Sequence, residues 1–215
     1  MTSHLYMQKI IFSALCLGAL LSVTVSAQNT SSTSATIGQT APDFTLQGSD
    51  GKQHSLADYK GKFIVLEWTN PQCPFVRRFY SSGAMQKLQK TETAKNVVWL
   101  RINSSAEGHE GYQSVSDLAS YVKDQSVAAT ASLLDPNGQV GHIFGARTTP
   151  HMFVIDPKGV LIYAGGIDND PTADVSDTPP ASNYVTTALD EAMAGKPVST
   201  PTAPPYGCSV KYASN

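Results

Sequence analysis

Two cysteines, Cys73 and Cys208, are the residues of this chain best suited to chemistry. Cys73 stands between a strand-type run, FIVLEW, and a run with helical spacing, so its sulfur is expected at the positive end of a helix. Unpaired N–H groups there favour a thiolate, which attacks disulfides and is the form that peroxides oxidise. Arg77 and Arg78 add positive charge nearby. The sequence therefore predicts an activated thiol at Cys73 rather than an inert buried cysteine.

The surroundings of Cys73 lack the usual local partner. Thiol sites that follow a strand often carry a second cysteine three residues on, and Val76 stands at that position. The polar turn TNPQ before Cys73 predicts an exposed sulfur. Cys73 therefore either has a partner farther along the chain or acts as a single thiol that depends on an external one.

The N-terminal segment 1–27 is expected to be a secretory signal peptide. A basic residue precedes the apolar run IIFSALCLGALLSV, and the small residues Val25-Ser26-Ala27 follow it. The run is shorter than the roughly 18–20 apolar residues of a membrane span, so we expect cleavage after Ala27 and no stable membrane insertion, with an uncleaved anchor as the alternative. Cleavage removes Cys16. Cys73 and Cys208 then remain in an exported protein, periplasmic or secreted, as either one bridge or two free thiols.

Glu67 is the second candidate for chemistry. It interrupts a strand that is otherwise apolar, where an unpaired carboxylate costs several kcal/mol or takes up a proton. It precedes Cys73 by six residues, so it is placed to exchange protons with the thiol. The alternative is a residue at the strand end that pairs with a lysine or arginine.

Other polar residues predict no metal or cofactor site. His142 and His151 have no close cluster of cysteines or carboxylates, so both are interpreted as ordinary residues. The Asp168–Asp170 cluster lacks the spacing and closing glutamate of an EF-hand loop and is interpreted as a solvated turn.

Composition fits one packed domain with extensions. The chain has 215 residues, 41% of them hydrophobic, and a formal net charge of −2, which gives no indication of a nucleic-acid partner. A polar linker is expected at 28–36, the domain at 37–195, and an extended Pro-rich tail that carries Cys208 at 196–215.

Strand and helix patterns alternate along the domain, which predicts an α/β fold with a mixed central sheet flanked by helices. The expected strands are a short edge strand through Phe44 and Leu46 followed by a hairpin at Asp50–Gly51, FIVLEW, NVVWLRI, and the pair MFVID and VLIYAGG around the turn Asp156–Gly159. The expected helices are Pro74 to about Thr91, YQSVSDLASYVKD, QVGHIFGA, and NYVTTALDEAMAGK, which ends near Gly195.

Four motifs together resemble a known group of proteins. APDFTL, VLEW-x4-CP, TTPHMFVIDPKG and PYGCSVKY are similar to segments of the peroxiredoxin-like redoxins of the AhpC/TSA superfamily, over about Ile37 to Tyr212. The resemblance implies a thioredoxin-like fold. It also implies that the Thr149–Pro150 bond is cis and faces the active cysteine, where its backbone pairs with an extended substrate, and that Glu67 is the buried acid of the site.

The chain departs from this group at two positions. Thioredoxins have a C-x-x-C motif, which Val76 breaks, and peroxiredoxins have a threonine where this chain has Asn70 next to Thr69. The resemblance therefore fixes the fold better than the reaction. We predict an exported thiol oxidoreductase, for antioxidant defence or thiol-disulfide exchange, in which Cys73 is the nucleophile and Cys208 resolves the product from the tail. Its partners would be a protein disulfide or peroxide substrate and an external thiol reductant.

Two alternatives belong to other classes. One is a thioredoxin-fold copper chaperone, although such proteins place their cysteines close together in sequence. The other is a redox-silent module in which Cys73–Cys208 is a structural disulfide, which a reduction potential below about −300 mV would indicate.

Overall fold

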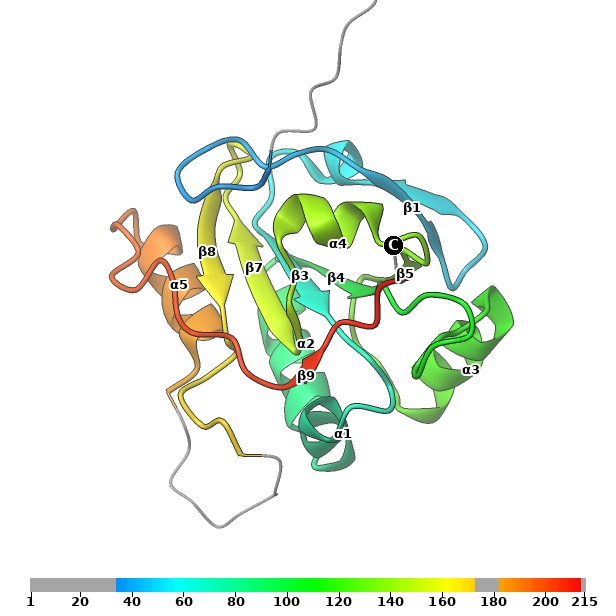
Figure 1. The fold of residues 1–215 in the computed structure, drawn as a ribbon. Helices are drawn as coiled ribbons and strands as arrows, with labels where there is room; N and C mark the ends of the chain where they lie inside the picture. The colour runs from blue at the N-terminus through cyan, green and yellow to red at the C-terminus, as the bar shows by residue number, and fades with distance from the viewer. Residues whose placement is uncertain (1–33, 173–181, 214–215) are drawn as a thin grey trace, which may run out of the picture. The chain divides into compact units, whose positions relative to one another are not determined.

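A computed structural model describes residues 34–172 and 182–213 (Figure 1). The expected signal peptide and most of the expected linker lie outside the described residues. A seven-stranded sheet forms the centre of the described part. In spatial order its strands are β2 (Gln53–Ser55), β1 (Thr45–Gly48), β5 (Ala131–Leu134), β4 (Val98–Asn103), β3 (Ile64–Trp68), β7 (His151–Ile155) and β8 (Leu161–Gly165).

The sheet is mixed, as predicted. The strands β3, β4 and β5 are parallel neighbours, whereas β7, β8, β1 and β2 pair antiparallel with their neighbours. The predicted hairpins at Asp50–Gly51 and Asp156–Gly159 join β1 to β2 and β7 to β8. The strand β5 was not among the predicted strands, because its four residues, ASLL, are too short to show a period.

Helices cover both faces of the sheet. They are η1 (Leu56–Tyr59, a 3₁₀ helix), α1 (Pro74–Ser81), α2 (Ala84–Ala94), α3 (Val115–Asp124), α4 (Gln139–Phe144) and α5 (Tyr184–Met193). The prediction of one helix from Pro74 to Thr91 was wrong, because Gly83 adopts a left-handed φ of 76° and separates α1 from α2. None of the helices in the two described ranges is long and apolar enough to cross a membrane.

The strand β3 divides the core into two layers. Leu66 and Trp68 pack with Phe144 of α4 on one side, while Val65 packs with residues of α1, α2 and α5 on the other. Figure 1 shows α4 and α2 on opposite faces of the sheet. Each such side chain contributes about 1.5–3 kcal/mol when it is fully buried. The central strand is therefore a rigid base for the turn that follows Trp68.

The C-terminal segment returns across the sheet to the end of β3. After α5 it runs along β8, where the N–H of Ala164 donates to the carbonyl of Pro201 over 3.0 Å. It then forms β9 (Cys208–Ser209), which pairs antiparallel with β6 (Thr148–Thr149) in a separate two-stranded sheet. Figure 1 shows this segment in red, passing in front of the end of β7.

Candidate thiol active site

A tight turn between β3 and α1 holds Cys73. The N–H of Cys73 donates to the carbonyl of Asn70 over 3.2 Å, and the N–H of Gln72 donates to the Asn70 side-chain oxygen over 2.8 Å. The Asn70 amide donates in turn to the backbone oxygen of Glu110 over 3.1 Å. Cys73 is the N-cap residue of α1 and Pro74 opens the helix, where its missing N–H leaves no bond unmade. Asn70, noted in the sequence only as a departure from peroxiredoxins, is thus the residue that fixes the turn.

The sulfurs of Cys73 and Cys208 are in contact. Their Sγ atoms lie 2.7 Å apart although the residues are 135 positions apart in sequence. Both are thiols in this structure. Cys208 reaches the turn because it pairs with Thr149 in the β6–β9 ladder. The structure thus brings together the two cysteines that remain after the expected signal cleavage, at a separation from which a disulfide of about 2.05 Å can form with little movement.

The pKa values of the two thiols are shifted in opposite directions. Burial alone would raise the pKa of Cys73, but hydrogen bonds from the Cys208 thiol and from the backbone N–H groups of Cys208 and Val76 outweigh it, so this pKa lies below its ordinary value. Burial and the adjacent Cys73 sulfur raise the pKa of Cys208 to about 12. Of the two thiols, Cys73 therefore gives up its proton at the lower pH, and Cys208 keeps its proton.

The prediction that Cys73 is exposed was wrong. Its relative exposure is 1%, whereas Cys208 is half-buried. The polar residues Thr69 and Asn70 of the preceding turn are buried as well. The cause lies far away in sequence, since the β9 segment and the Thr149 backbone lie against the sulfur of Cys73.

Arg78 does not act as a free positive charge beside the thiol. Its guanidinium lies 3.0 Å from the carboxylate of Asp170 and 3.5 Å from that of Asp168, so the charge is matched by two acids. Asp168 is itself buried, and the interpretation of the Asp168–Asp170 cluster as a solvated turn was wrong at that residue. Arg77 is exposed. The lowering of the Cys73 pKa thus comes from hydrogen bonds rather than from the arginines.

Glu67 lies in a buried network on the α1–α2 side of the sheet. One carboxylate oxygen accepts a hydrogen bond from Tyr80 Oη over 2.8 Å, and the other accepts from Gln89 Nε2 over 3.0 Å and from Trp99 Nε1 over 2.7 Å. Arg101, its partner in the β3–β4 register, adds a nearby positive charge. In the described part of the chain no hydrogen bond joins Glu67 to either sulfur. Its proton exchange with Cys73 stays a prediction.

Thr149 and Pro150 lie directly against the thiol pair. The peptide bond between them is cis, which confirms the expectation taken from the resemblance. The carbonyl oxygen of Thr149 is 3.1 Å from the sulfur of Cys73 and accepts its hydrogen bond when the thiol is protonated. The backbone edge expected to receive an extended substrate is taken by Cys208 and Ser209 of the same chain.

The two histidines have packing roles. His142 stacks on Tyr212 with 4.0 Å between ring centroids, and burial lowers the pKa of His151 to about 4. Within the ranges 34–172 and 182–213, no three His, Cys, Asp or Glu side chains are grouped so that they could hold a metal ion.

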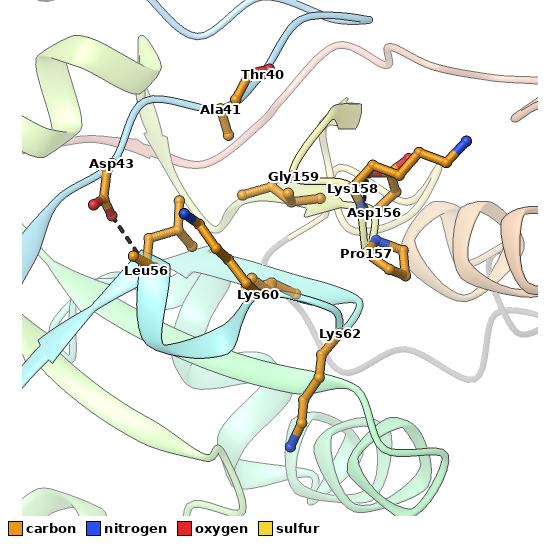
Figure 2. Close-up of a pocket in the computed structure, with 13 residues that line it drawn as sticks. Thr40, Ala41, Asp43, Leu56, Lys60, Lys62, Asp156, Pro157, Lys158 and Gly159 are labelled. Atoms are coloured by element: carbon orange, nitrogen blue, oxygen red, sulfur yellow. Dashed lines mark hydrogen bonds between the residues drawn. The ribbon is translucent and has the colours of Figure 1, made fainter.

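A separate pocket of about 270 Å³ opens at the other end of the sheet (Figure 2). It is lined by Ile64, the first residue of β3, and by Ile155, the last residue of β7. Cys73 follows the opposite end of β3, and neither sulfur lines this pocket. The pocket is therefore separate from the thiol site.

Comparison with known proteins identifies the family. A protein-family sequence model described as the AhpC/TSA family matches residues 37–164, more than half of the chain. The matched residues include Cys73 and the Thr149–Pro150 bond. The chain belongs to the AhpC/TSA family. This AhpC/TSA protein is 33% identical over 125 residues to thioredoxin-like protein YneN of Bacillus subtilis (strain 168), which covers 58% of this chain and 68% of the relative. It is 29% identical over 130 residues to thiol-disulfide oxidoreductase ResA of Geobacillus thermodenitrificans, which covers 60% of this chain and 69% of the relative.

Solved structures confirm the predicted thioredoxin-like α/β fold of the AhpC/TSA protein. An uncharacterized conserved protein from Geobacillus kaustophilus superimposes with a TM-score of 0.75 at 24% identity, over 84% of this chain and 94% of that one. A putative thioredoxin from Neisseria meningitidis superimposes with a TM-score of 0.53 at 22% identity, over 72% of this chain and 89% of that one. At this identity the likeness shows the fold alone. The family match and the named relatives therefore identify the chain as a thioredoxin-like protein in a family that includes thiol-disulfide oxidoreductases.

Two residues beside the thiol pair of this AhpC/TSA protein lie within the motif PYGCSVKY but had no predicted role. Tyr206 and Tyr212 flank Cys208 in the tail, and each packs against the domain. The signal that could have found them is that two aromatic residues flank Cys208 in a Pro-rich segment.

Proposed function

We propose that the protein is an exported thiol oxidoreductase in which Cys73 is the nucleophile and Cys208 the resolving cysteine. The observation that carries the proposal is the 2.7 Å contact between the two sulfurs, with the pKa of Cys73 lowered and that of Cys208 raised. A redox-silent disulfide needs no such difference in acidity. A catalytic pair uses it, because one sulfur must attack while the other keeps its proton.

The first step is attack by the Cys73 thiolate. With a disulfide, a new S–S bond forms between Cys73 and one substrate sulfur, and the other substrate sulfur leaves as a thiolate. With a hydroperoxide, the sulfur takes the terminal OH as a sulfenic acid, the O–O bond breaks, and the alkoxide leaves and is protonated to the alcohol. The peroxide takes two electrons from the Cys73 sulfur in this step. The substrate disulfide takes one electron from Cys73 here, and its two-electron reduction is complete when Cys208 has also been oxidised in the second step.

The second step is resolution by Cys208. Its sulfur attacks the oxidised Cys73 sulfur, and the Cys73–Cys208 disulfide forms as the substrate thiolate or water leaves. The proton of the Cys208 thiol goes to the leaving group. An external thiol reductant then returns the pair to two thiols and is itself oxidised to a disulfide.

Two further residues have proposed roles. Glu67 is proposed as the acid that exchanges protons with the thiol during the cycle. The backbone of Thr149 and Pro150 is proposed to bind an extended substrate when β9 is displaced, since an unpaired strand edge offers main-chain donors and acceptors to a peptide.

The test is a peroxidase assay and a disulfide-reductase assay, run side by side on the wild-type protein, Cys73→Ser and Cys208→Ser. We expect Cys73→Ser to abolish both activities and Cys208→Ser to stop after one turnover, with substrate or a sulfenic acid retained on Cys73. Equal activity in Cys73→Ser and the wild type would reject the proposal. A Cys73–Cys208 reduction potential below about −300 mV would instead favour the structural disulfide.

A further inference from the structure

The segment Tyr206–Tyr212 is fastened to the domain on both sides of Cys208. On the N-terminal side, the hydroxyl of Tyr206 donates to the carboxylate of Asp168 and lies 3.4 Å from Nη2 of Arg78. The Tyr206 ring packs on Phe75 of α1 with 6.0 Å between centroids. The residue just before Gly207 and Cys208 is therefore anchored to α1 and to the loop after β8.

On the C-terminal side, Tyr212 fits a slot on α4. Its hydroxyl donates to the carbonyl of Ala146 over 2.8 Å, and its ring stacks on His142. The slot is open because Gly138 and Gly141 have no side chains. A Cβ added at either position would overlap the ring or the hydroxyl of Tyr212. The helix α4 is thus shaped to receive this one aromatic residue.

Between the two anchors the tail fills a strand edge. Cys208 and Ser209 pair with β6, and the N–H of Val210 donates to the carbonyl of Arg147 over 3.0 Å. Gly207, with φ of 117°, approaches the carbonyl of Thr149 so closely that any side chain there would overlap it. The edge of β6 beside Cys73 is therefore occupied while the tail is bound, and an extended peptide cannot pair with it there.

We propose that Tyr206 and Tyr212 are positioning residues that clamp Cys208 over Cys73, and that the clamped tail makes the thiol site react faster with small oxidants than with extended polypeptides, which must first displace β9. This inference rests on the proposed function, because it names the substrate class of the same thiol pair. A small disulfide or hydroperoxide needs a smaller opening over the buried sulfur of Cys73 than a polypeptide does, and needs no strand edge. An extended peptide needs the whole segment removed from β6, which breaks both anchors and the strand pairing.

The test uses two probes with the same leaving group, the coloured thionitrobenzoate. One is its mixed disulfide with 2-mercaptoethanol, and the other is its mixed disulfide with the cysteine of a short unstructured peptide. Gly141→Ala places a methyl group in the slot that receives Tyr212, while alanine remains a residue that favours a helix. Gln139→Ala, an exposed position on the same helix, is the matched control. Tyr206→Phe removes only the hydroxyl of the other anchor.

We expect the wild type and Gln139→Ala to react at least about tenfold faster with the small probe than with the peptide probe. Gly141→Ala and Tyr206→Phe should raise the peptide rate by about tenfold and change the small-probe rate by less than about threefold. In glutathione buffers, both variants should also weaken the Cys73–Cys208 disulfide, because Cys208 is no longer held in place.

Adding Tyr212→Ala to Gly141→Ala should cause little further change, because both act on one anchor. Equal wild-type rates with the two probes, unchanged in both variants, would overturn the clamp while leaving the thiol chemistry intact. Failure of the proposed function would give a different result in the same assay. In that case, Cys73→Ser combined with Tyr206→Phe would still release thionitrobenzoate at the rate of Tyr206→Phe alone. Should Gly141→Ala fail to fold, Tyr206→Phe tests the same clamp from its other end.

Discussion

The carbonyl oxygen of Thr149 lies 3.1 Å from the sulfur of Cys73, and the backbone of the same residue is the register partner of Cys208. One residue therefore contacts the first thiol and aligns the second. A slip of the β6–β9 pairing by one residue would bring Ser209 opposite Thr149 and turn the Cys208 side chain to the other face. The geometry of the thiol pair therefore depends on that short ladder and on the contacts of Tyr206 and Tyr212 that hold the tail in register.

The first prediction concerns the thiol pair itself. Cys208→Ala removes the side chain whose hydrogen bond with the Cys73 sulfur lowers the pKa of Cys73, so that pKa should rise. Since a thiolate predominates only above its pKa, the midpoint of the alkylation rate against pH should move to higher pH than in the wild type. In the wild type, Cys208 should alkylate only at strongly alkaline pH, because its pKa is raised to about 12.

Cys208→Ser is the matched control, because its hydroxyl can still donate to Cys73. Its midpoint should lie between those of the wild type and Cys208→Ala. Identical midpoints in all three proteins would mean that the Cys208 side chain does not set the acidity of Cys73.

The second prediction concerns acid stability. Burial lowers the pKa of His151 from 6.5 to about 4, so the unfolded chain binds a proton over this range and the folded protein does not. Stability should therefore fall as the pH is lowered from 6.5 to 4, by up to about 3 kcal/mol from this residue. Urea unfolding at a series of pH values measures it. His151→Gln should flatten this part of the profile, and His142→Gln, at the surface of α4, should leave it unchanged.

The sequence supplied those parts of the fold that have local patterns. The strand β3, the turn at Cys73 and the two hairpins are readable because apolar runs and turn residues stand next to each other in the chain. The break between α1 and α2 was missed because a single Gly83 at positive φ outweighs a spacing that is otherwise helical. Periodicity cannot show a residue whose backbone leaves the helical region.

Burial at the site could not be predicted, because it depends on contacts with no local trace. Cys73 is covered by a residue 135 positions away, and Arg78 is matched by Asp170, 92 positions away. Nothing in the TNPQ turn or in the pair Arg77–Arg78 encodes those partners. The cis bond at Thr149–Pro150 was predicted only through the resemblance, since local pattern sets a low base rate for it.

The third prediction tests Glu67 as a proton-exchanging group. Glu67→Gln keeps the size of the side chain but cannot take up a proton, so turnover should fall by about 100-fold and one limb of the pH–rate profile should be lost. Its stability should fall by about 1–3 kcal/mol, since three donors face the carboxylate. Glu92→Gln, a second fully buried acid, is the control that should lose stability without any change in the profile. A Glu67→Gln protein with an unaltered profile would assign the residue to packing alone.

The fourth prediction concerns export, which rests on the sequence of residues 1–27. The secreted or periplasmic protein should begin at Gln28, after the small residues Val25-Ser26-Ala27. N-terminal sequencing of protein from a secreting host checks this. Recovery of Met1 or Thr2 at the start of the mature protein would contradict cleavage, and Ala27→Arg should block it.

The last prediction links the tail anchor to stability. Arg78→Met removes the cation that lies between Asp168, Asp170 and Tyr206, and breaking a buried pair from one side costs about 3 kcal/mol or more. Burial already raises the pKa of Asp168, and Arg78 opposes that rise, so the pKa should climb further in the variant. An acid whose pKa is raised on folding destabilises the fold increasingly as the pH rises from its unfolded pKa of 3.8 to its folded pKa, and by a constant amount above that. The stability deficit of Arg78→Met should therefore be large at pH 7 and smaller at pH 4.

Asp168→Asn separates this charge effect from loss of packing. In the double variant with Arg78→Met the buried carboxylate of Asp168 is absent, so the deficit should be smaller than the sum of the two single changes and should depend less on pH, since only Asp170 then loses its pairing with Arg78. Because Tyr206 bonds to the same pair, Arg78→Met should also speed alkylation of Cys73, whereas Arg77→Met, at the exposed neighbouring position, should change neither stability nor alkylation. A deficit of equal size at both pH values, with Cys73 still protected, would show that Arg78 stabilises α1 without holding the tail.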